Sequence, residues 1–421
     1  KLLEPEIEKP HLHHLFYDVE MPLAKVLKEI EQEGIAIDTA ALTAFSKELD
    51  QRLIELDQQI KELAGEAFNI DSPKQLGEIL YEKLQISSKA KKTKTGQYAT
   101  SEDILQKHEH DHPIIPMILE YRQLRKLKST YVDPLPTLCD RIDGRIHTNF
   151  MQTVTATGRL SSNNPNLQNI PVRTEEGRKI RDCFTVGKGY VALLTADYSQ
   201  IEMRIMAHLS EDKGLITAFE SGEDLHSTVA SQVFGVKASE VDAQMRRTIK
   251  AMSYGLAYGL SSFGLAQQLD IDPVSAGELM NKYFERFGGI RDYLKTVVEQ
   301  ARELGYTQTI LGRRRYLPDL NHENRQRREI AERAALNAPI QGSAADIIKI
   351  AMLKVDSKIK SENLRSRLLL QVHDELILEV SPGEHEILSK IVKEQMSNAY
   401  ELNVPLDVNI GVGKSWDLAA H

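Results

Sequence analysis

Residues 190–197 read Tyr-Val-Ala-Leu-Leu-Thr-Ala-Asp, an apolar run that ends at Asp197. A second stretch, residues 368–380, reads Leu-Leu-Leu-Gln-Val-His-Asp-Glu-Leu-Ile-Leu-Glu-Val and places Asp374 between two apolar segments. A carboxylate beside a buried apolar run is costly unless it is paired or bound to a metal. We therefore expect two strands that lie side by side and share a site for divalent cations. Two metals there would stabilise both the attacking and the leaving oxygen of a phosphoryl displacement.

The composition is that of an ordinary globular protein. The 421 residues are 41% hydrophobic and 27% charged, enough for two or three domains or for one domain with large lobes. The two cysteines, Cys139 and Cys183, exclude a disulfide framework and a cysteine-rich zinc site, and they fit a reducing compartment. The sequence has no apolar stretch of membrane-spanning length and no signal-peptide pattern. Its first residue, Lys1, is compatible with a piece of a longer protein.

Charge is distributed unevenly along the chain. The net charge of −8 mildly disfavours a nucleic-acid partner. However, an acid-free stretch over residues 86–101 holds Lys89, Lys91, Lys92 and Lys94. A second basic cluster contains Arg313, Arg314, Arg315, Arg325, Arg327 and Arg328. Each cluster alone is typical of a solvated loop, but together with metal-ready carboxylates they favour contacts to phosphates.

The first third of the chain is predicted to be a helical arm. Apolar residues recur there at steps of three and four: Leu42, Phe45, Leu49, Leu53, Leu56, Ile60 and Leu63. Ser72 before Pro73 is typical of a helix start. Another helix is expected over residues 114–131, and the lysine-rich stretch between these helices should be an exposed tip.

The rest of the chain is predicted to be a sheet that a helical segment interrupts. Strand-like sequence begins near Arg145, whereas residues 211–336 are mostly helical in pattern. A further helix over residues 344–360 leads into the hairpin that carries Asp374. Apolar strands before and after a helical segment indicate one sheet domain that the chain leaves and re-enters.

One predicted helix, residues 246–259, combines cations with aromatic side chains. Its functional positions recur every four residues: Arg246, Lys250, Tyr254 and Tyr258. Such a stripe lies along one helix face and can grip a triphosphate and stack on a base. Gly255 and Gly259 each weaken a helix by roughly 1 kcal/mol relative to Ala. We therefore expect close packing against the backbone or a bend at this point.

Several blocks together resemble family A DNA polymerases, the bacterial DNA polymerase I type. They are residues 157–162, 166–171, 197–202, 246–259, 337–342 and 372–375. The blocks stand in the order of that family, and the resemblance covers essentially the whole chain. It implies a multi-subdomain α+β fold shaped like a right hand, with an antiparallel-sheet palm and helical fingers and thumb. The implied boundaries are palm 1–29, thumb 30–136, palm 137–210, fingers 211–336 and palm 337–421.

The resemblance also implies an activity. The chain would add deoxynucleoside triphosphates to a primer 3′-OH on primer-template DNA and release pyrophosphate, in DNA replication or repair. It would work as a monomer in the bacterial cytoplasm, at the nucleoid, or in an organelle, away from membranes. Asp197, Asp374 and the backbone carbonyl of Tyr198 would hold two Mg²⁺ ions, which Mn²⁺ can replace. Lys250 would donate a proton to the departing pyrophosphate, and Glu375 would support the site, although neighbouring strand residues point to opposite faces.

The resemblance assigns further residues to the substrates. The implied nucleotide-binding residues are Gln200, Glu202, His226, Arg246, Lys250 and Tyr254. Glu202 would block a 2′-hydroxyl, and Tyr254 stands where many family members carry phenylalanine, which implies easier entry of dideoxynucleotides. The implied DNA-binding residues are Lys91, Lys92, Lys94, Arg159, Arg173, Tyr258, Asn337, Gln341 and His373. Arg159 and Gln341 would contact the minor-groove edge, where every correct pair offers similar acceptors.

Three other functions use part of this pattern. A single-subunit RNA polymerase shares the paired aspartates and the lysine–tyrosine helix, but Glu202 argues against it. A non-catalytic nucleic-acid-binding homologue needs neither the aspartates nor Lys250. A metal-dependent nuclease needs no helix that grips a triphosphate. The sequence shows no further cluster of carboxylates for a second metal site, so we expect no proofreading exonuclease in this chain.

Overall fold

The computed structural model describes residues 10–420, apart from residues 88–89, 94 and 223. Its centre is a four-stranded antiparallel sheet in the order β10-β5-β9-β8. The strands are β5 (Ala192–Tyr198), β8 (Arg367–Val372), β9 (Glu375–Val380) and β10 (Val408–Gly413). The two apolar runs of the sequence therefore pair as neighbours, β5 against β9, as expected. Sheet and helices together confirm the α+β class.

Helices cover the sheet, so its strands are unusually apolar. Every residue of β9 is buried, which explains why its sequence does not alternate between apolar and polar residues. The covering helices are α3 (Met21–Glu33), α17 (Arg325–Ser361), α18 (His385–Ser397) and α19 (Trp416–Ala419). The single tryptophan, Trp416, is fully buried in this core.

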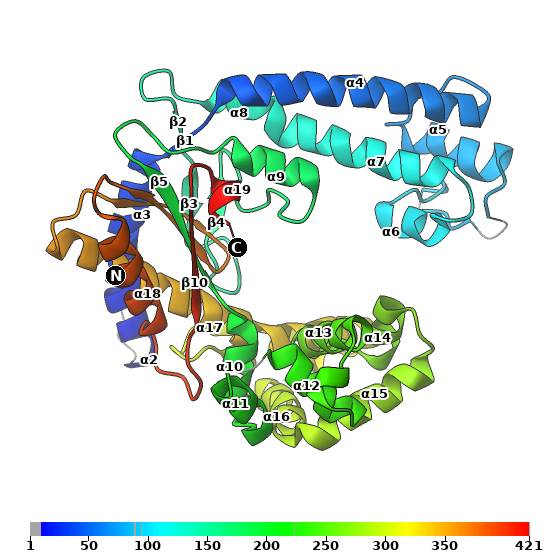
Figure 1. The fold of residues 1–421 in the computed structure, drawn as a ribbon. Coiled ribbons are helices and arrows are strands. Elements are labelled where there is room, and N and C mark those ends of the chain that lie inside the picture. The colour runs from blue at the N-terminus through cyan, green and yellow to red at the C-terminus, as the bar shows by residue number, and fades with distance from the viewer. Residues whose placement is uncertain (1–9, 88–89, 94, 223, 421) are drawn as a thin grey trace.

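A long helical arm projects from the sheet domain (Figure 1). It consists of α4 (Thr39–Ala64), α5 (Pro73–Gly77), η2 (Glu78–Lys83), α6 (Glu102–Leu105), η3 (Gln106–His108), α7 (Ile114–Leu127), η4 (Lys128–Val132) and α8 (Pro134–Leu138). The expected stripe of α4 is buried against α7, with Leu63 only partly covered. Ser72 caps α5 by accepting from Gln75 N at 3.5 Å, as the sequence predicted.

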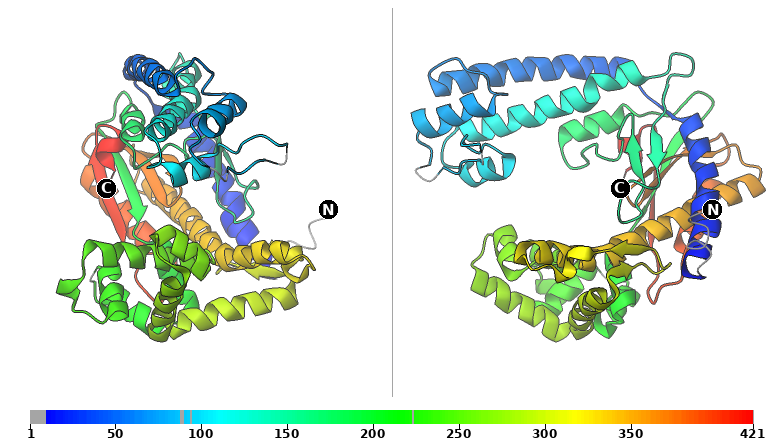
Figure 2. Two further views of the ribbon diagram at one scale, coloured as in Figure 1. Left: turned by 90° about the vertical axis from the view of Figure 1, so that its right-hand side faces the viewer. Right: turned by 180° about the vertical axis from the view of Figure 1, so that it is seen from behind.

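A second helical lobe lies across from the arm (Figures 1 and 2). It contains α10 (Ile201–Ser210), α11 (Lys213–Glu220), α12 (Leu225–Phe234), η5 (Ala238–Glu240), α13 (Ala243–Ala257), α14 (Ser262–Leu269), α15 (Pro273–Arg286) and α16 (Gly288–Leu304). Side-chain caps fix where α11, α12, α13 and α15 begin, because each follows an aspartate that accepts a backbone N–H. The lobe also holds a hairpin that the sequence did not predict, β6 (Tyr306–Gln308) with β7 (Arg314–Tyr316).

One helix, α17, joins this lobe to the sheet domain. We expected a helix from residue 344, but α17 begins at Arg325 and continues through Pro339. A proline inside a helix costs about 3 kcal/mol. Packing outweighs that cost here, since Ala335, Ala338 and Ile340 are buried on either side of the proline.

The remaining elements connect these parts. They are α2 (Pro10–His14), η1 (Leu15–Glu20), β1 (Ile35–Ala36) paired with β2 (Arg145–Ile146), β3 (Asn149–Met151) paired with β4 (Ser161–Asn163), α9 (Glu175–Asp182) and η6 (Pro318–Asn321). Cys139 and Cys183 are both free, and Cys183 is buried as an apolar side chain would be. None of the described helices combines the length and the apolarity of a bilayer span.

Candidate active site

The two aspartates meet at one end of the central sheet. Asp197 is the penultimate residue of β5, directly opposite Glu375 in the β5–β9 register. Asp374 lies in the turn between β8 and β9, not on a strand as the sequence suggested. Tyr198 N donates to the carbonyl oxygen of Asp374 at 3.3 Å, which joins the two segments. The argument that Glu375 and Asp374 point to opposite faces of a strand therefore does not apply.

Burial and mutual repulsion perturb these carboxyl groups. Burial, together with the nearby charges of Asp374 and Glu375, raises the pKa of Asp197 to about 8. Burial also raises the pKa of Asp374, and it raises the pKa of Glu375 to about 7 against the opposing effect of Arg181. Within the described part of the chain, neither aspartate makes an ion pair, whereas Glu375 lies 3.9 Å from Arg181. Among the described residues the aspartate pair therefore has no directly paired cation, and the charges of His373 and Arg159 offset the effect of burial on Asp374 only in part.

This donor set fits a divalent metal. Two carboxylates and a backbone carbonyl form an all-oxygen set, which suits Mg²⁺. A second group of ligand atoms, which the sequence analysis missed, lies elsewhere: Asp140, Asp143 and His147 have one donor atom each within 4.8 Å of one another. That group is partly exposed and flanks β2: Asp140 and Asp143 precede the strand and His147 follows it.

The helix of cations and aromatics, α13, faces the aspartates. Lys250 and Tyr254 line a cavity of about 690 Å³ together with Arg173. Burial raises the pKa of Tyr254 to about 12, and the charges of Glu202, Asp374 and Asp197 add to the shift. The phenol of Tyr254 is therefore close to the carboxylates of the sheet.

The two glycines of this segment serve different purposes. A Cβ at Gly255 would lie 2.7 Å from Leu260 Cδ2, so the expected close packing is present. Gly259 lies outside the helix, because α13 ends at Ala257, and its φ of +70° is the left-handed conformation that glycine adopts readily. The prediction that Gly259 lies within the helix was wrong.

His226 adjoins α13 from the neighbouring helix α12. It is buried, its ring lies 6.1 Å from that of Tyr254, and its Nδ1 has no hydrogen-bond partner among the described residues. Burial lowers the pKa of His226; the charge of Asp224 opposes this shift, whereas the charges of Lys250 and Arg246 add to it. His226 therefore lies within electrostatic range of Lys250, Arg246 and Asp224.

Glu202 connects the helical lobe to the sheet domain. Its Oε2 accepts from the hydroxyl of Tyr258 at 2.6 Å, and its Oε1 accepts from Arg159 Nη2 at 2.8 Å. Burial and the bond to Glu202 raise the pKa of Tyr258 to about 12. Gln200, at the start of the same helix, has a buried Oε1 without a partner in the described structure.

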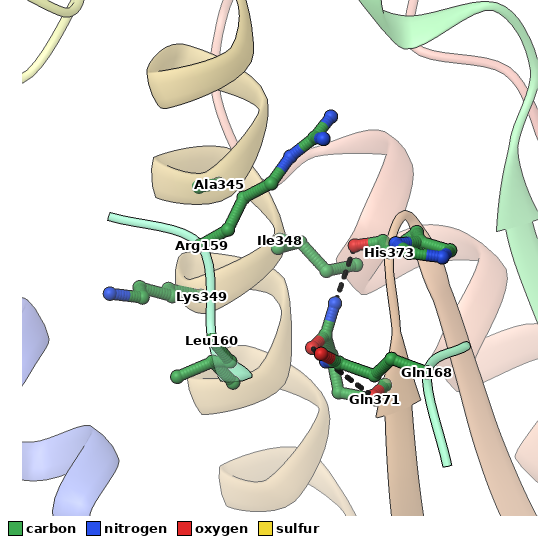
Figure 3. Close-up of a pocket in the computed structure, with 8 residues that line it drawn as sticks. All are labelled: Arg159, Leu160, Gln168, Ala345, Ile348, Lys349, Gln371 and His373. Carbon is green, nitrogen blue, oxygen red and sulfur yellow. Dashed lines mark hydrogen bonds between the residues drawn. The ribbon is translucent and has the colours of Figure 1, made fainter. Parts of the chain in front are cut away.

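Figure 3 shows a small pocket beside the turn that carries Asp374. Arg159 and His373, both predicted from the sequence, line it together with Gln168, Gln371 and Lys349. Gln371 Nε2 donates to the carbonyl oxygen of His373 at 2.5 Å, and Gln168 Nε2 donates to Gln371 Oε1 at 3.1 Å. These bonds support the left-handed backbone of His373, whose φ is +55°.

The sequence analysis did not name Gln168 or Gln371 as site residues. A polar residue inside the apolar run of β8 was the available signal for Gln371. Of the other residues predicted to contact DNA, Asn337 and Gln341 lie on α17, and the Oδ1 of Asn337 is buried without a partner among the described residues.

A larger groove of about 860 Å³ runs between the arm and the sheet domain. Arg173 and His373 line it from one side, and Arg122 and Lys126 of α7 line it from the other. Neither Arg122 nor Lys126 was predicted. At the end of the arm, Lys91 and Lys92 are exposed as expected, whereas Lys89 and Lys94 lie outside the described residues.

Comparisons with known proteins agree with this geometry. The family model described as DNA polymerase family A matches residues 39–418. DNA polymerase I of Mycobacterium tuberculosis (strain ATCC 25618 / H37Rv) is 54% identical over 100% of this chain and 46% of its own length. DNA polymerase I of Bacillus subtilis (strain 168) is 48% identical over 98% of this chain and 47% of its own length.

A solved structure extends the similarity to three dimensions. It is described as the POL domain of Pol1 from M. smegmatis in complex with DNA primer-template and dNTP. It has a TM-score of 0.95 and 56% sequence identity, and the match covers 100% of this chain and 74% of that one. The chain spans about half the length of the relatives named above. It belongs to DNA polymerase family A.

Proposed function

We propose that this chain catalyses template-directed DNA synthesis, in which deoxynucleoside triphosphates are added to a primer 3′-OH and pyrophosphate is released. One observation carries the proposal: Asp197 and Asp374 meet at the end of the sheet, opposite the face of α13 that bears Lys250 and Tyr254. The substrates would be primer-template DNA and deoxynucleotides, bound by a monomer in the bacterial cytoplasm at the nucleoid. Residues 30–136 would be the thumb, residues 211–336 the fingers and the sheet domain the palm.

Family A DNA polymerases depend on divalent metal ions, and we propose Mg²⁺ for this chain. Asp197, Asp374 and the carbonyl of Tyr198 are the groups that would hold it. When bound there, Mg²⁺ would lower the pKa of the primer hydroxyl and neutralise charge on the triphosphate. We assign Glu375 a supporting role at this end of the sheet, because it stands opposite Asp197 and near Arg181.

The triphosphate would bind along α13. Arg246, Lys250 and His226 supply donors around one spot, and charge-assisted bonds to phosphate oxygens are stronger than neutral ones. Lys250 lines the cavity next to Tyr254, so it is placed to protonate the departing pyrophosphate. Gln200, whose buried Oε1 has no partner among the described residues, would complete the nucleotide site.

Two residues would discriminate between nucleotides by the hydroxyl groups of their sugars. Glu202 is held rigidly by Tyr258 and Arg159, so its carboxylate can exclude a 2′-hydroxyl. Tyr254 lies near the same carboxylates, where a phenol can supply a polar group if the 3′-hydroxyl is missing. This use of Glu202 is what favours DNA synthesis over the alternative of an RNA polymerase.

The duplex would lie in the groove between the arm and the sheet domain. Arg159 and Gln341 would contact the minor-groove edge of the terminal pairs, and His373 would contact the DNA beside them. Asn337 and Arg173 would contact the strands beside them, and Lys91 and Lys92 would contact phosphates at the tip of the arm. We extend this last role to Lys94.

The test is primer extension with Mg²⁺ and deoxynucleotides, run beside Asp374→Ala and a control. The parent should extend the primer, Asp374→Ala should not, and Asp292→Ala should behave as the parent, because Asp292 is an exposed residue of α16. Binding of the same DNA by Asp374→Ala, measured by gel shift, separates lost chemistry from lost folding. Equal activity of Asp374→Ala and the parent contradicts the proposal, and preference for ribonucleotides would favour the RNA polymerase.

A further inference from the structure

Asp224, the aspartate that caps α12, forms an ion pair with Arg246 of α13. Arg246 Nε donates to Asp224 Oδ2 at 2.7 Å, and Arg246 Nη2 donates to Asp224 Oδ1 at 3.0 Å. This bidentate geometry is the most specific that an arginine and a carboxylate form. Asp224 also caps α12, since its Oδ2 accepts from Ser227 N at 3.2 Å and from Ser227 Oγ at 2.5 Å. The carboxylate is thus fixed by α12 and in turn fixes the guanidinium.

The contact leaves part of the guanidinium open. An arginine has five N–H donors, and the bond to Asp224 uses Nε and one hydrogen of Nη2. Among the described residues, Nη1 of Arg246 has no hydrogen-bond partner. His226, only two residues after Asp224, is close enough to Arg246 and Lys250 for both charges to lower its pKa. The open donors therefore belong to the same cluster as His226 and Lys250.

Without Asp224 this arrangement would be unstable. Arg246 is 55% exposed, and its long side chain has many alternative conformations in water. Lys250 carries the same charge one helical turn away, and like charges four residues apart on a helix repel each other. The carboxylate of Asp224, paired with Arg246, both offsets this repulsion and selects one conformation.

We propose that Asp224 is a positioning residue for the nucleotide: it holds Arg246 so that Nη1 and the remaining Nη2 hydrogen point toward the triphosphate. This inference rests on the proposed function, in which Arg246 contacts phosphate. Asp224 itself does not contact the substrate, because an acid beside a triphosphate would repel it. The bond to Arg246 persists when nucleotide binds.

An alternative role for Asp224 predicts the opposite change in nucleotide affinity. If Asp224 were a substitute anion that the triphosphate must displace, removal of its charge would strengthen nucleotide binding. A positioning residue predicts weaker binding after the same change. The direction of the effect therefore decides between the two roles.

The chain offers a matched pair of variants. Asp224→Asn keeps the cap, because Asn is as good at a helix start as Asp, but it removes the charge that holds Arg246. Asp242→Asn makes the same change at the cap of α13, where Asp242 Oδ1 accepts from Met245 N at 2.7 Å. Within the described residues Asp242 makes no ion pair. Any general effect of changing a capping aspartate in this lobe should appear in both variants.

The experiment is steady-state primer extension with varied deoxynucleotide. For Asp224→Asn we expect KM to rise about tenfold, the order expected when a charge-assisted bond is removed, with kcat within about twofold of the parent. Asp242→Asn should leave both constants unchanged. In an Arg246→Gln background, Asp224→Asn should add nothing, because the two residues act as one unit. A lower KM for Asp224→Asn, an unchanged KM, or full additivity with Arg246→Gln would overturn the proposal.

A second measurement does not depend on catalysis. Deoxynucleoside triphosphate with Mg²⁺ should raise the melting temperature of the parent and of Asp242→Asn, and the shift should be smaller for Asp224→Asn. If the parent does not extend primers but Asp224→Asn still binds the triphosphate more weakly than the parent does, the positioning role is supported and the polymerase proposal fails. Equal triphosphate shifts in parent and variant would refute the positioning role alone. Arg246→Lys, which cannot form the bidentate contact, should repeat the effect of Asp224→Asn.

Discussion

Replacing Glu20 with Gln should destabilise the sheet domain by about 3–5 kcal/mol, the usual result of removing one partner from a buried ion pair. Glu20 ends η1, and its Oε1 accepts from Lys349 Nζ at 2.7 Å and also from Arg313. Lys349 is fully buried in α17, and among the described residues its ammonium has no other hydrogen-bond partner. Arg313 also contacts Asp346, so two cations face two acids. Glu20→Gln leaves the buried ammonium of Lys349 without the carboxylate that it contacts and offers only a neutral amide oxygen in its place.

The tryptophan provides a local probe for this measurement. Trp416 is the single tryptophan and is buried in the core of the sheet, so its fluorescence during urea unfolding reports on the domain that contains Glu20. Glu29→Gln is the matched control: Glu29 pairs with Lys360, and both side chains are about half exposed. An exposed pair contributes roughly 0–1 kcal/mol. The difference between the two variants isolates the effect of burial.

Two results would refute this reasoning. A loss below about 1 kcal/mol for Glu20→Gln would mean that the ion cluster behaves as if it were solvated. Failure of Lys349→Met to recover stability in the Glu20→Gln background would mean that the unpaired ammonium is not the cause. In the parent, burial acts to raise the pKa of Glu20, but Lys349 and Arg313 outweigh it and hold the pKa below its usual range. The stabilisation is therefore complete above pH ~4.3 and is lost as the pH falls through the lower folded value, a dependence that Glu20→Gln should lack.

Three further predictions concern the site. Glu202→Ala should raise ribonucleotide incorporation relative to deoxynucleotide by about 10–100-fold, because the carboxylate fixed by two hydrogen bonds is gone; unchanged sugar discrimination in primer extension would contradict the assignment. Tyr254→Phe should incorporate dideoxynucleotides less readily than the parent, since the phenol is absent, and equal chain termination would show that the hydroxyl plays no part. Replacing Lys91 and Lys92 with Ala should reduce the slope of log Kd against log salt for duplex DNA by roughly one for each phosphate that the arm no longer neutralises; an unchanged slope would place the tip of the arm away from DNA.

The parts of the fold that the sequence predicted are those where one local pattern dominates. The apolar stripe of α4 is long and strictly periodic, and the apolar runs of β5 and β9 are buried on both faces. The hairpin of β6 and β7 has no such pattern, since β7 reads Arg-Arg-Tyr. Cross-strand contacts hold it together: Arg314 Cζ lies 4.2 Å from the ring centre of Tyr306, and Tyr306 and Tyr316 meet edge to face at 5.6 Å. Such pairs exist only after the strands have met.

In the candidate site too, the residues that local sequence patterns describe were predicted and the others were missed. Residues that touch substrate in the proposal were found because residue type and spacing describe them: carboxylates beside apolar runs and cations one helical turn apart. Residues that support them were missed, because their partners are distant in sequence. Gln168 and Gln371 are separated by 203 positions and still share a hydrogen bond under the turn at His373. No local pattern identifies such a pair.

The two capping aspartates of α12 and α13 show where prediction from local sequence ends. Asp224 and Asp242 each stand one residue before a helix and accept a backbone N–H three residues on, so local rules describe both as helix starts. Only the packing of α12 against α13 brings Arg246 to Asp224 and leaves Asp242 without an ion pair among the described residues. Identical sequence signals thus acquire different functions from tertiary contacts alone. For this reason a charge-neutral substitution at each aspartate, which keeps both caps, should separate what the sequence specifies locally from what only the fold creates.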